Sequence, residues 1–345
     1  MKSWTMAIIA LVALSAGCSS GDIPPPPIGT PQAGAGLSPP LAGAHKKAQH
    51  VYWTFYAGRT YPEVQGAKIP LAAKSKTVNV GGDTQNDLTY TSGMTVDKSG
   101  HLWILSFGKY GGNPVTALVF DLPLKASSLP KYSFVLSGTD GSDALVFDPS
   151  GNLWASSPGN NEVLEYSGPF TKSGSLSPAL TLDGGGYQPY GVAFDKSANL
   201  YISIFNSTGT NSIAVAAPPY KSAPYFLDGL TSPGSLTFDA AGNLYSSSNG
   251  SSGAAVVRYD AGNLKKGAKP NVVDPAGLPS SSYMSAFAFT STGDLYVANC
   301  GNSGSAGIDV YPTSRQHFSA NLKPSVLYTN ADIQGAGCAW GIAIR

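Results

Sequence analysis

Residues 144–157 read ALVFDPSGNLWASS. A short apolar run is followed by a polar turn, and a second apolar run follows the turn. Two apolar runs separated by a tight turn are the pattern of a β-hairpin. The stretch therefore predicts two adjacent antiparallel strands.

The same pattern recurs along the chain. The other copies are 93–106 (GMTVDKSGHLWILS), 191–203 (GVAFDKSANLYIS), 235–248 (SLTFDAAGNLYSSS) and 286–299 (AFAFTSTGDLYVAN). The leucines that they share are Leu102, Leu153, Leu200, Leu244 and Leu295, spaced by 51, 47, 44 and 51 residues. Propeller repeats have periods of about 40 to 50 residues, with one four-stranded blade per repeat. The spacing therefore predicts a β-propeller.

Further apolar runs supply the remaining strands of each blade. Third strands are expected at 117–120, 163–166, 213–216, 256–259 and 308–311. Fourth strands are expected at 132–137, 179–183, 224–228, 271–274 and 325–328.

The two ends of the chain together predict a sixth blade. Residues 339–345 (AWGIAIR) have the form of a first strand. Its partners are expected at 50–56, near 64–71 and at 77–82. Pairing them closes the ring and removes unpaired edges. The expected fold is all-β, a six-bladed propeller in which N-terminal strands pair with the C-terminal strand.

The turn of each hairpin has a structural explanation. An aspartate can accept backbone N–H groups at the start of the turn, and a glycine can adopt positive φ near its end. Ala198 replaces the glycine in one copy, where we expect slight strain, and Thr290 replaces the aspartate in another. A calcium loop would need a run of carboxylates that the motif lacks. The aspartates are Asp97, Asp148, Asp195 and Asp239.

The N-terminus is similar to a bacterial lipoprotein signal. Lys2 precedes an apolar run at 4–14, which is too short to span a bilayer. Residues 14–18 (LSAGC) resemble the lipobox, in which the cysteine is acylated, although Ser15 stands where leucine is usual. Ordinary secretion with cleavage nearby is the alternative. The resemblance implies a protein exported through the inner membrane and lipid-anchored at Cys18 in the cell envelope, with the outer membrane favoured.

Three segments follow from this reading. They are a signal peptide at 1–17, a lipid-linked tether rich in proline and glycine at 18–47, and the propeller at 48–345. Charged residues make up 12% of the chain and the net charge is +1. This balance provides no basic surface for nucleic acid, so none is expected as a partner.

The repeated motif resembles two families of propellers. The form Gly-x-Ala-Phe-Asp-x-x-Gly-Asn-Leu-Tyr-Val-Ala-Asn is similar to NHL repeats and to the senescence-marker/gluconolactonase-like propellers, over residues 90–345. The match is specific for architecture and uninformative about activity, because it consists of turn and core residues.

Such propellers place the residues before each first strand at one mouth of the central channel. Here these are Ser92, Asp143, Tyr190, Gly234, Ser285 and Trp340, and the loops on the same face carry Asn160, Asn161, Asn206, Asn249 and Asn299. Asp143, Tyr190 and Trp340, with Asn206, Asn249 and Asn299, form the predicted binding set for a small polar ligand such as a sugar. The alternative is that the two aromatic residues close the channel and the loops are connectors.

The gluconolactonase resemblance implies a second function, a metal-dependent lactone hydrolase. Members of that family hold a divalent metal at this mouth with carboxylates and an amide. This sequence lacks their Glu-Gly-Pro motif and has Tyr190 where an acid is common, so Asp143 is the one aligned carboxylate. No catalytic residue, metal or cofactor is therefore predicted. A non-catalytic envelope protein that binds a ligand or a protein partner ranks ahead of the hydrolase and of a purely structural lipoprotein.

The two remaining cysteines form the last predicted pair. Cys18 is assigned to the lipid, which leaves Cys300 and Cys338 in an oxidising compartment. Both are expected at the same end of adjacent blades, so we predict a disulfide between them. Two free cysteines are the alternative.

Overall fold

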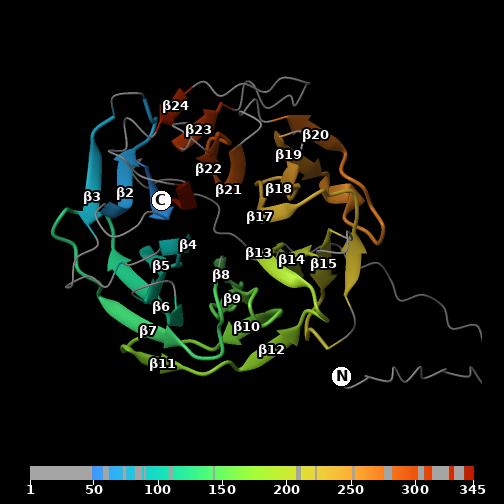
Figure 1. The fold of residues 1–345 in the computed structure, drawn as a ribbon, viewed down its shortest axis with the longest axis horizontal. Coiled ribbons are helices and arrows are strands. Elements are labelled where there is room, and N and C mark those ends of the chain that lie inside the picture. Colours follow the sequence, from blue (N-terminus) through green and yellow to red (C-terminus); the bar gives the residue numbers. More distant parts are fainter. Residues whose placement is uncertain are drawn as a thin grey trace, which may run out of the picture. The chain divides into compact units, whose positions relative to one another are not determined.

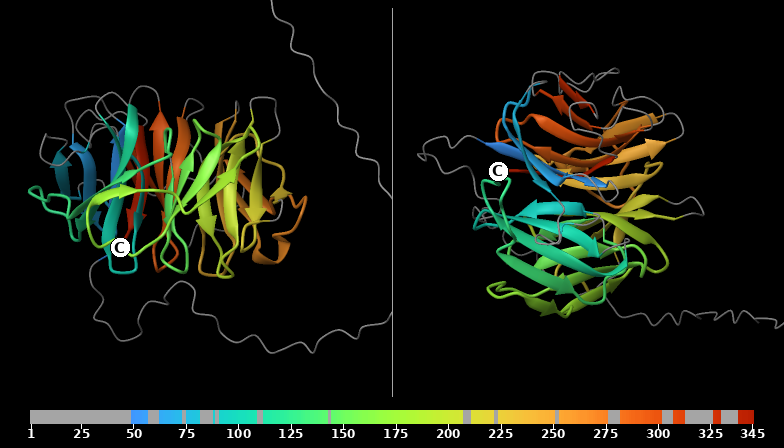
Figure 2. Two further views of the ribbon diagram at one scale, coloured as in Figure 1. Left: turned by 90° about the horizontal axis from the view of Figure 1, so that it is seen from below. Right: turned by 60° about the vertical axis from the view of Figure 1, so that its left-hand side comes forward.

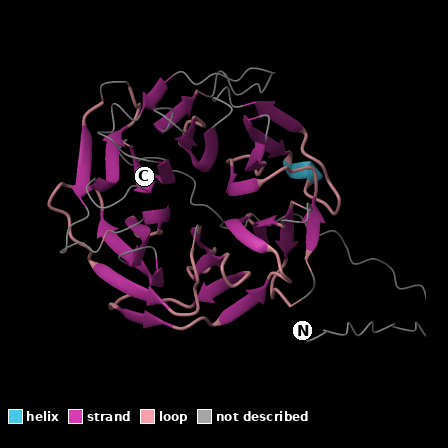
Figure 3. Ribbon diagram, in the orientation of Figure 1, coloured by secondary structure: helices cyan, strands magenta, loops and turns pink. Residues whose placement is uncertain are grey.

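Six β-sheets form a ring, one sheet for each predicted blade (Figure 1). The structure is a computed structural model that describes residues 49–56, 62–72, 75–81, 88, 91–108, 112–142, 144–206, 211–221, 224–250, 253–275, 282–301, 307–312, 326–329 and 338–345. The predicted signal peptide and tether lie outside these residues, so the segment boundaries stay predictions. The one helical element described is a single 3-10 turn, η1 (Ala261–Asn263), and strands and loops make up the rest (Figure 3).

The first three blades contain the N-terminal half of the described chain and the C-terminal strand. Blade 1 is ordered β25 (Cys338–Ile344), β1 (His50–Tyr56), β2 (Pro62–Lys68), β3 (Thr77–Gly81) from the channel outward. Blade 2 is β4 (Thr91–Val96), β5 (His101–Gly108), β6 (Gly112–Asp121), β7 (Tyr132–Leu136), with β11 (Gly174–Leu176) at its outer edge. Blade 3 is β8 (Leu145–Phe147), β9 (Leu153–Ser157), β10 (Glu162–Tyr166), β12 (Leu180–Asp183).

The other three blades follow the predicted four-strand pattern. Blade 4 is β13 (Gln188–Phe194), β14 (Leu200–Phe205), β15 (Ser212–Ala216), β16 (Tyr225–Leu227). Blade 5 is β17 (Pro233–Phe238), β18 (Leu244–Gly250), β19 (Gly253–Tyr259), β20 (Val272–Pro275). Blade 6 is β21 (Ser282–Phe289), β22 (Leu295–Gly301), β23 (Gly307–Tyr311), β24 (Val326–Thr329).

The ring closes as predicted. The C-terminal strand β25 is the innermost strand of blade 1 and pairs antiparallel with β1, with Val51 opposite Ile344. The backbone of His50 also exchanges two hydrogen bonds with that of Arg345, of 2.7 and 2.9 Å. The two ends of the folded part therefore share one sheet, which confirms the six-bladed closed propeller.

One strand was not predicted. β11 lies in sequence between β10 and β12 of blade 3, yet it pairs in parallel with β7 of blade 2. The segment between the third and fourth strands of blade 5 also bonds to the outer strand of the preceding blade, because Gly267 N donates to Phe226 O of blade 4 (2.7 Å). These segments partly cover the outer edge of the preceding blade. Edge-on views show the sheets side by side around the ring (Figure 2).

The hairpin aspartates act within their turns, as predicted. Asp148 Oδ1 accepts Asn152 N (2.9 Å), and Asp148 Oδ2 accepts Asn152 Nδ2 (3.0 Å) and Trp154 Nε1 (3.2 Å). Asp97, Asp195 and Asp239 accept equivalent bonds. Positive φ follows at Gly151 (93°), and Ala198 adopts it too (62°). Each carboxylate thus accepts hydrogen bonds from its own hairpin, from the turn and from the second strand.

The blade 6 copy replaces this arrangement with a contact to blade 1. Thr290 Oγ1 accepts Asp294 N (2.9 Å), which keeps the turn closed without the aspartate. Tyr296 occupies the position of Trp154, and its hydroxyl accepts Leu71 N of blade 1 at 3.2 Å. The aromatic residue that anchors a turn elsewhere therefore helps to join the last blade to the first.

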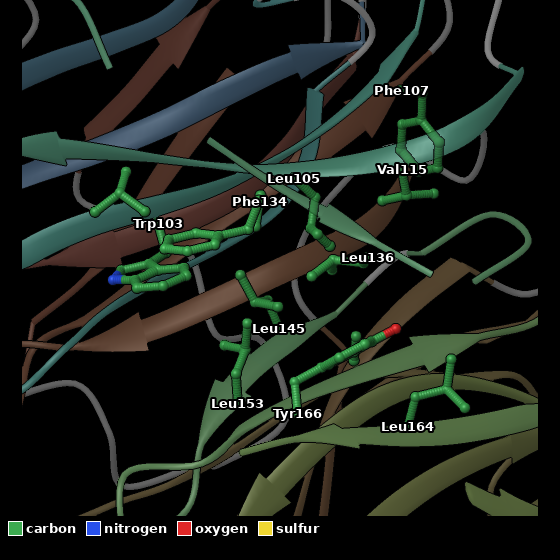
Figure 4. Packing of buried hydrophobic residues seen from close by; sticks show 13 residues of the cluster. Trp103, Leu105, Phe107, Val115, Phe134, Leu136, Leu145, Leu153, Leu164 and Tyr166 are labelled. Carbon is green, nitrogen blue, oxygen red and sulfur yellow. The ribbon is translucent and has the colours of Figure 1, made fainter. Parts of the chain in front are cut away.

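The hydrophobic core lies between neighbouring blades. Between blades 2 and 3, Trp103 stacks on Phe134 with ring centroids 5.3 Å apart, and Leu145, Leu153 and Tyr166 pack against them (Figure 4). Each sheet is buried on both faces, which explains why the strands show imperfect alternation. In the described part of the chain, no helix is long and apolar enough to cross a membrane.

Candidate functional site

A β-bulge recurs in the innermost strands at the mouth of the channel. One extra residue is inserted between Thr91 and Met94 of β4 and between Pro189 and Val192 of β13. β17, β21 and β25 carry the same insertion. In blade 3, β8 begins at Leu145, and Asp143 lies outside the described residues.

The bulges contain most of the sequence-predicted mouth residues. Ser92, Tyr190, Gly234, Ser285 and Trp340 lie at equivalent positions of five inner strands. They are therefore arranged around one end of the channel.

Hydroxyl groups of the second strands join the bulges of successive blades. Thr54 Oγ1 accepts Gly341 N of its own blade (2.7 Å) and donates to Ser92 O of blade 2 (2.8 Å). Ser203 Oγ accepts Gly191 N (2.6 Å) and donates to Gly234 O of blade 5 (2.6 Å). One buried hydroxyl thus satisfies two backbone groups and bridges two blades.

Serines of the inner strand take this role where the second strand has an apolar residue. Ser92 Oγ donates to Ser142 O of blade 3 (2.6 Å), and blade 2 has Leu105 in place of the hydroxyl residue. Ser285 Oγ donates to Ala339 O of blade 1 (2.5 Å), and blade 6 has Ala298 at that place. Ser92 and Ser285 therefore use their hydroxyls to hold the ring together.

Two glycines of the bulges allow this close approach. A Cβ at Gly191 would overlap Gly234 O of the next blade, and one at Gly341 would overlap Ser92 O. The glycines at these positions permit the inner strands to meet backbone to backbone.

Two aromatic side chains remain partly exposed at the mouth. Tyr190 and Trp340 belong to blades 4 and 1, which lie on opposite sides of the ring (Figure 1). The Tyr190 hydroxyl donates to Gln188 Oε1 (3.3 Å), and its ring meets Phe205 edge-on at 6.3 Å between centroids. The equivalent residues Ser92, Gly234 and Ser285 are small. The mouth thus combines two opposed aromatic groups with small neighbours.

Two of the predicted amides form hydrogen bonds at the interface of blades 5 and 6. Asn249 Oδ1 accepts Met284 N (2.9 Å), and Asn249 Nδ2 donates to Met284 O (3.2 Å). Asn299 is fully buried, and its Nδ2 donates to Asp309 Oδ2. The ligand role predicted for these two residues is not tested by their placement.

The other amides stand apart from this pair. Asn206 N donates to Asn211 Oδ1 (3.0 Å), and Asn160 Nδ2 donates to Gly138 O (2.8 Å). Asn161 adopts a positive φ of 59°, which asparagine tolerates in turns. These contacts are within or between neighbouring loops.

Asp309 is a site residue that the sequence reasoning missed. Its side chain is 0% exposed, and burial raises its pKa to about 7, while the hydrogen bond from Asn299 acts in the opposite direction. The acid stands in an apolar run, GIDVY, and a single acid in a strand that is otherwise apolar is the signal that could have found it.

Cys300 is 5% exposed at the end of β22. Cys338 begins β25, the inner strand of the adjacent blade, but its side chain lies outside the described ones. The Cys300–Cys338 bridge therefore stays a prediction.

The described residues do not supply the donor set of a metal centre. Among them, no three His, Cys, Asp or Glu side chains are grouped so that they could hold an ion. Asp143 lies outside this set, so the carboxylate that the hydrolase alternative needs is not placed by the structure.

Comparison with known proteins shows a shared fold. No protein-family model matches the chain, and no curated protein matches it. Among solved structures, that of a nidogen/laminin complex has a TM-score of 0.57 at 12% identity and covers 86% of this chain and 98% of that chain. A putative 6-phosphogluconolactonase from Bacteroides fragilis has 0.55 at 10% identity, with 80% and 81% covered. A periplasmic gluconolactonase from Pseudomonas aeruginosa has 0.53 at 13% identity, with 79% and 81% covered. At these identities the similarity establishes the propeller fold alone.

Proposed function

We propose that the propeller is a non-catalytic binding protein that holds a small polar ligand with a flat apolar face, such as a sugar, between Tyr190 and Trp340. The observation that carries this proposal is the pair of partly exposed aromatic residues at equivalent bulges of opposite blades. The residues at the equivalent positions of three other blades, Ser92, Gly234 and Ser285, are small.

Physical chemistry favours this class of ligand. Aromatic rings contact the C–H faces of a sugar, while hydrogen-bonding groups at the rim of such a site bind its polar groups. The hydroxyls of Ser92 and Ser285 are already used between blades, so ligand hydrogen bonds are expected from backbone groups and from Asp143.

Calorimetric titration with a panel of mono- and disaccharides tests the proposal. We expect at least one of them to bind, and Tyr190→Ala or Trp340→Ala to weaken its affinity at least tenfold. Phe226→Ala is the matched control, because Phe226 is an exposed aromatic residue on the outer strand β16, away from the mouth. Equal affinity in all four proteins would place the ligand elsewhere.

We further propose that the protein is anchored in the cell envelope through a lipid on Cys18. Support comes from the lipobox-like residues 14–18 and from the proline-rich segment between them and the propeller. Acyl chains contribute about 0.8 kcal/mol per buried CH₂ group, and stable anchoring needs more than one chain. Mass spectrometry of the membrane fraction is expected to show lipid on an N-terminal Cys18, and Cys18→Ala to release the protein. A soluble protein with an unmodified N-terminus elsewhere would contradict this.

Lactone hydrolysis is the second candidate function. The fold similarity to the Pseudomonas aeruginosa gluconolactonase favours it, and Asp143 is the residue on which it would depend. The test is hydrolysis of D-glucono-1,5-lactone with added Ca²⁺, Zn²⁺ or Mn²⁺. Metal-dependent turnover that is lost in Asp143→Asn would establish the hydrolase, and a rate equal to that without protein would remove it.

A further inference from the structure

A buried acid lies in the interface between blades 5 and 6, close to the mouth. Asp309 is on β23, on the same face as Tyr311, which packs with Val297 of β22 and with Tyr245 and Val256 of blade 5. The side chain of Asp309 is 0% exposed. An apolar interface thus surrounds a residue that is ionised in water at neutral pH.

The polar contacts of this acid are incomplete. Asp309 Oδ2 accepts from Asn299 Nδ2. Asp309 Oδ1 and Asn299 Oδ1 are both buried and have no hydrogen-bond partner among the described residues. The two orientations of an asparagine amide differ only in which atom is nitrogen and which is oxygen. If Asn299 is turned over, its Oδ1 faces Asp309 and accepts a hydrogen bond from the protonated acid.

A proton satisfies this pair better than a negative charge does. A buried carboxylate needs several donors or a cation, and a neutral acid needs one acceptor. Among the described side chains, the other ionisable groups on this interface are Tyr245, Arg258 and Tyr311. Arg258 Nε lies 2.9 Å from Asp260 Oδ1, and its guanidinium also lowers the pKa of Tyr245 against the larger effect of burial. Burial raises the pKa of Asp309 to about 7, against the smaller lowering effect of the hydrogen bond from Asn299. Asp274 lies opposite Val256 on β20, and its side chain is outside the described ones.

Neighbouring residues connect this acid to the mouth. Asn299 stands opposite Met284 on the inner strand β21. The Asn249 side chain of blade 5 accepts a hydrogen bond from Met284 N and donates one to Met284 O. The bulge residue Ser285 follows directly and bonds to blade 1.

We propose that Asp309 binds and releases a proton inside the interface of blades 5 and 6, and that its ionisation weakens the contact between these blades at the mouth. This inference is independent of the ligand proposal above. Charging Asp309 leaves a carboxylate with one amide donor in an apolar interface. The interface is therefore tightest when the acid is neutral.

The sign of the pH dependence follows from the two states. In the unfolded chain the acid ionises near its ordinary pKa of 3.8, and in the folded protein it ionises near 7. The stability that neutral Asp309 provides is complete below about pH 4, is lost progressively between about pH 4 and 7, and does not change further above that.

Thermal unfolding of Asp309→Asn and of the wild type from pH 4 to 8.5 tests the proposal. The variant is expected to gain several degrees of melting temperature relative to the wild type as the pH rises to about 7, and to keep this advantage above it. Asp183→Asn is the control, because Asp183 is exposed on the outer strand β12, outside the interface of blades 5 and 6, and this variant is not expected to show the gain of Asp309→Asn. A difference for Asp309→Asn that is constant with pH would overturn the proposal.

A second measurement needs no variant. A carboxyl ¹³C titration of the wild-type protein labelled at aspartate is expected to show one aspartate that titrates near pH 7. Titration of every aspartate below pH 5 would refute the proposal.

Discussion

Thr54→Val tests how the ring is held closed. Thr54 is fully buried, accepts Gly341 N at 2.7 Å and donates to Ser92 O at 2.8 Å, so its hydroxyl joins the two innermost strands of blade 1, β25 and β1, to blade 2. Valine has the same shape but no hydroxyl, and it leaves the two backbone groups without this partner. Each buried group left unsatisfied costs roughly 1–3 kcal/mol, so for the two groups we expect a loss of about 2–6 kcal/mol in the free energy of unfolding.

Thr54→Ser is the matched control for this change. Serine keeps both hydrogen bonds and removes one methyl group, which is worth about 1 kcal/mol. Chemical denaturation monitored by tryptophan fluorescence gives both values, with equal slopes required for the comparison. If Thr54→Val is no less stable than Thr54→Ser, the hydroxyl bridge does not stabilise the closure and the reasoning is wrong.

The remaining predictions concern the turns and the cysteines. Ala198→Gly should stabilise the protein by up to about 1 kcal/mol, because Ala198 adopts a φ of 62° that glycine accepts without strain. Gly151→Ala should destabilise it by about 1 kcal/mol, because φ is 93° there and alanine is strained in that conformation. A new Cβ would meet nothing within 4 Å, so no steric clash adds to this cost. Equal effects of the two substitutions in denaturation experiments would contradict this explanation. Thiol titration of the unreduced, unfolded protein should find neither Cys300 nor Cys338 free, and two free thiols would exclude their bridge.

The architecture could be predicted because the repeated hairpin carries it. The apolar runs on both sides of Asp148 and its equivalents specify strands, turn and period at once. Residues 339–345 predicted the closure, because they have the form of a first strand and residues 50–56 have the form of its partner; the two pair as β25 and β1. β11 could not be found in this way: Gly174–Leu176 has no apolar pattern, and it pairs through its backbone with β7 of another blade.

The site could be predicted in position but not in contacts. The alignment of repeats brings Tyr190 and Trp340 to equivalent bulges. The use of Ser92 and Ser285 between blades depends on which backbone carbonyl of the next blade lies within reach, and no single repeat contains that information. Asp309 was overlooked for a related reason, since its burial depends on two blades packing together.

Saturation-transfer NMR with the saccharide panel tests whether a sugar binds between Tyr190 and Trp340. It is recorded on the wild type and on a variant that combines Tyr190→Ala with Trp340→Ala, whose fold is checked by circular dichroism. The claim predicts that ring C–H protons of at least one saccharide receive saturation from the wild type and none from the folded double variant. Equal transfer in both proteins, or no transfer from the wild type to any member of the panel, would contradict it.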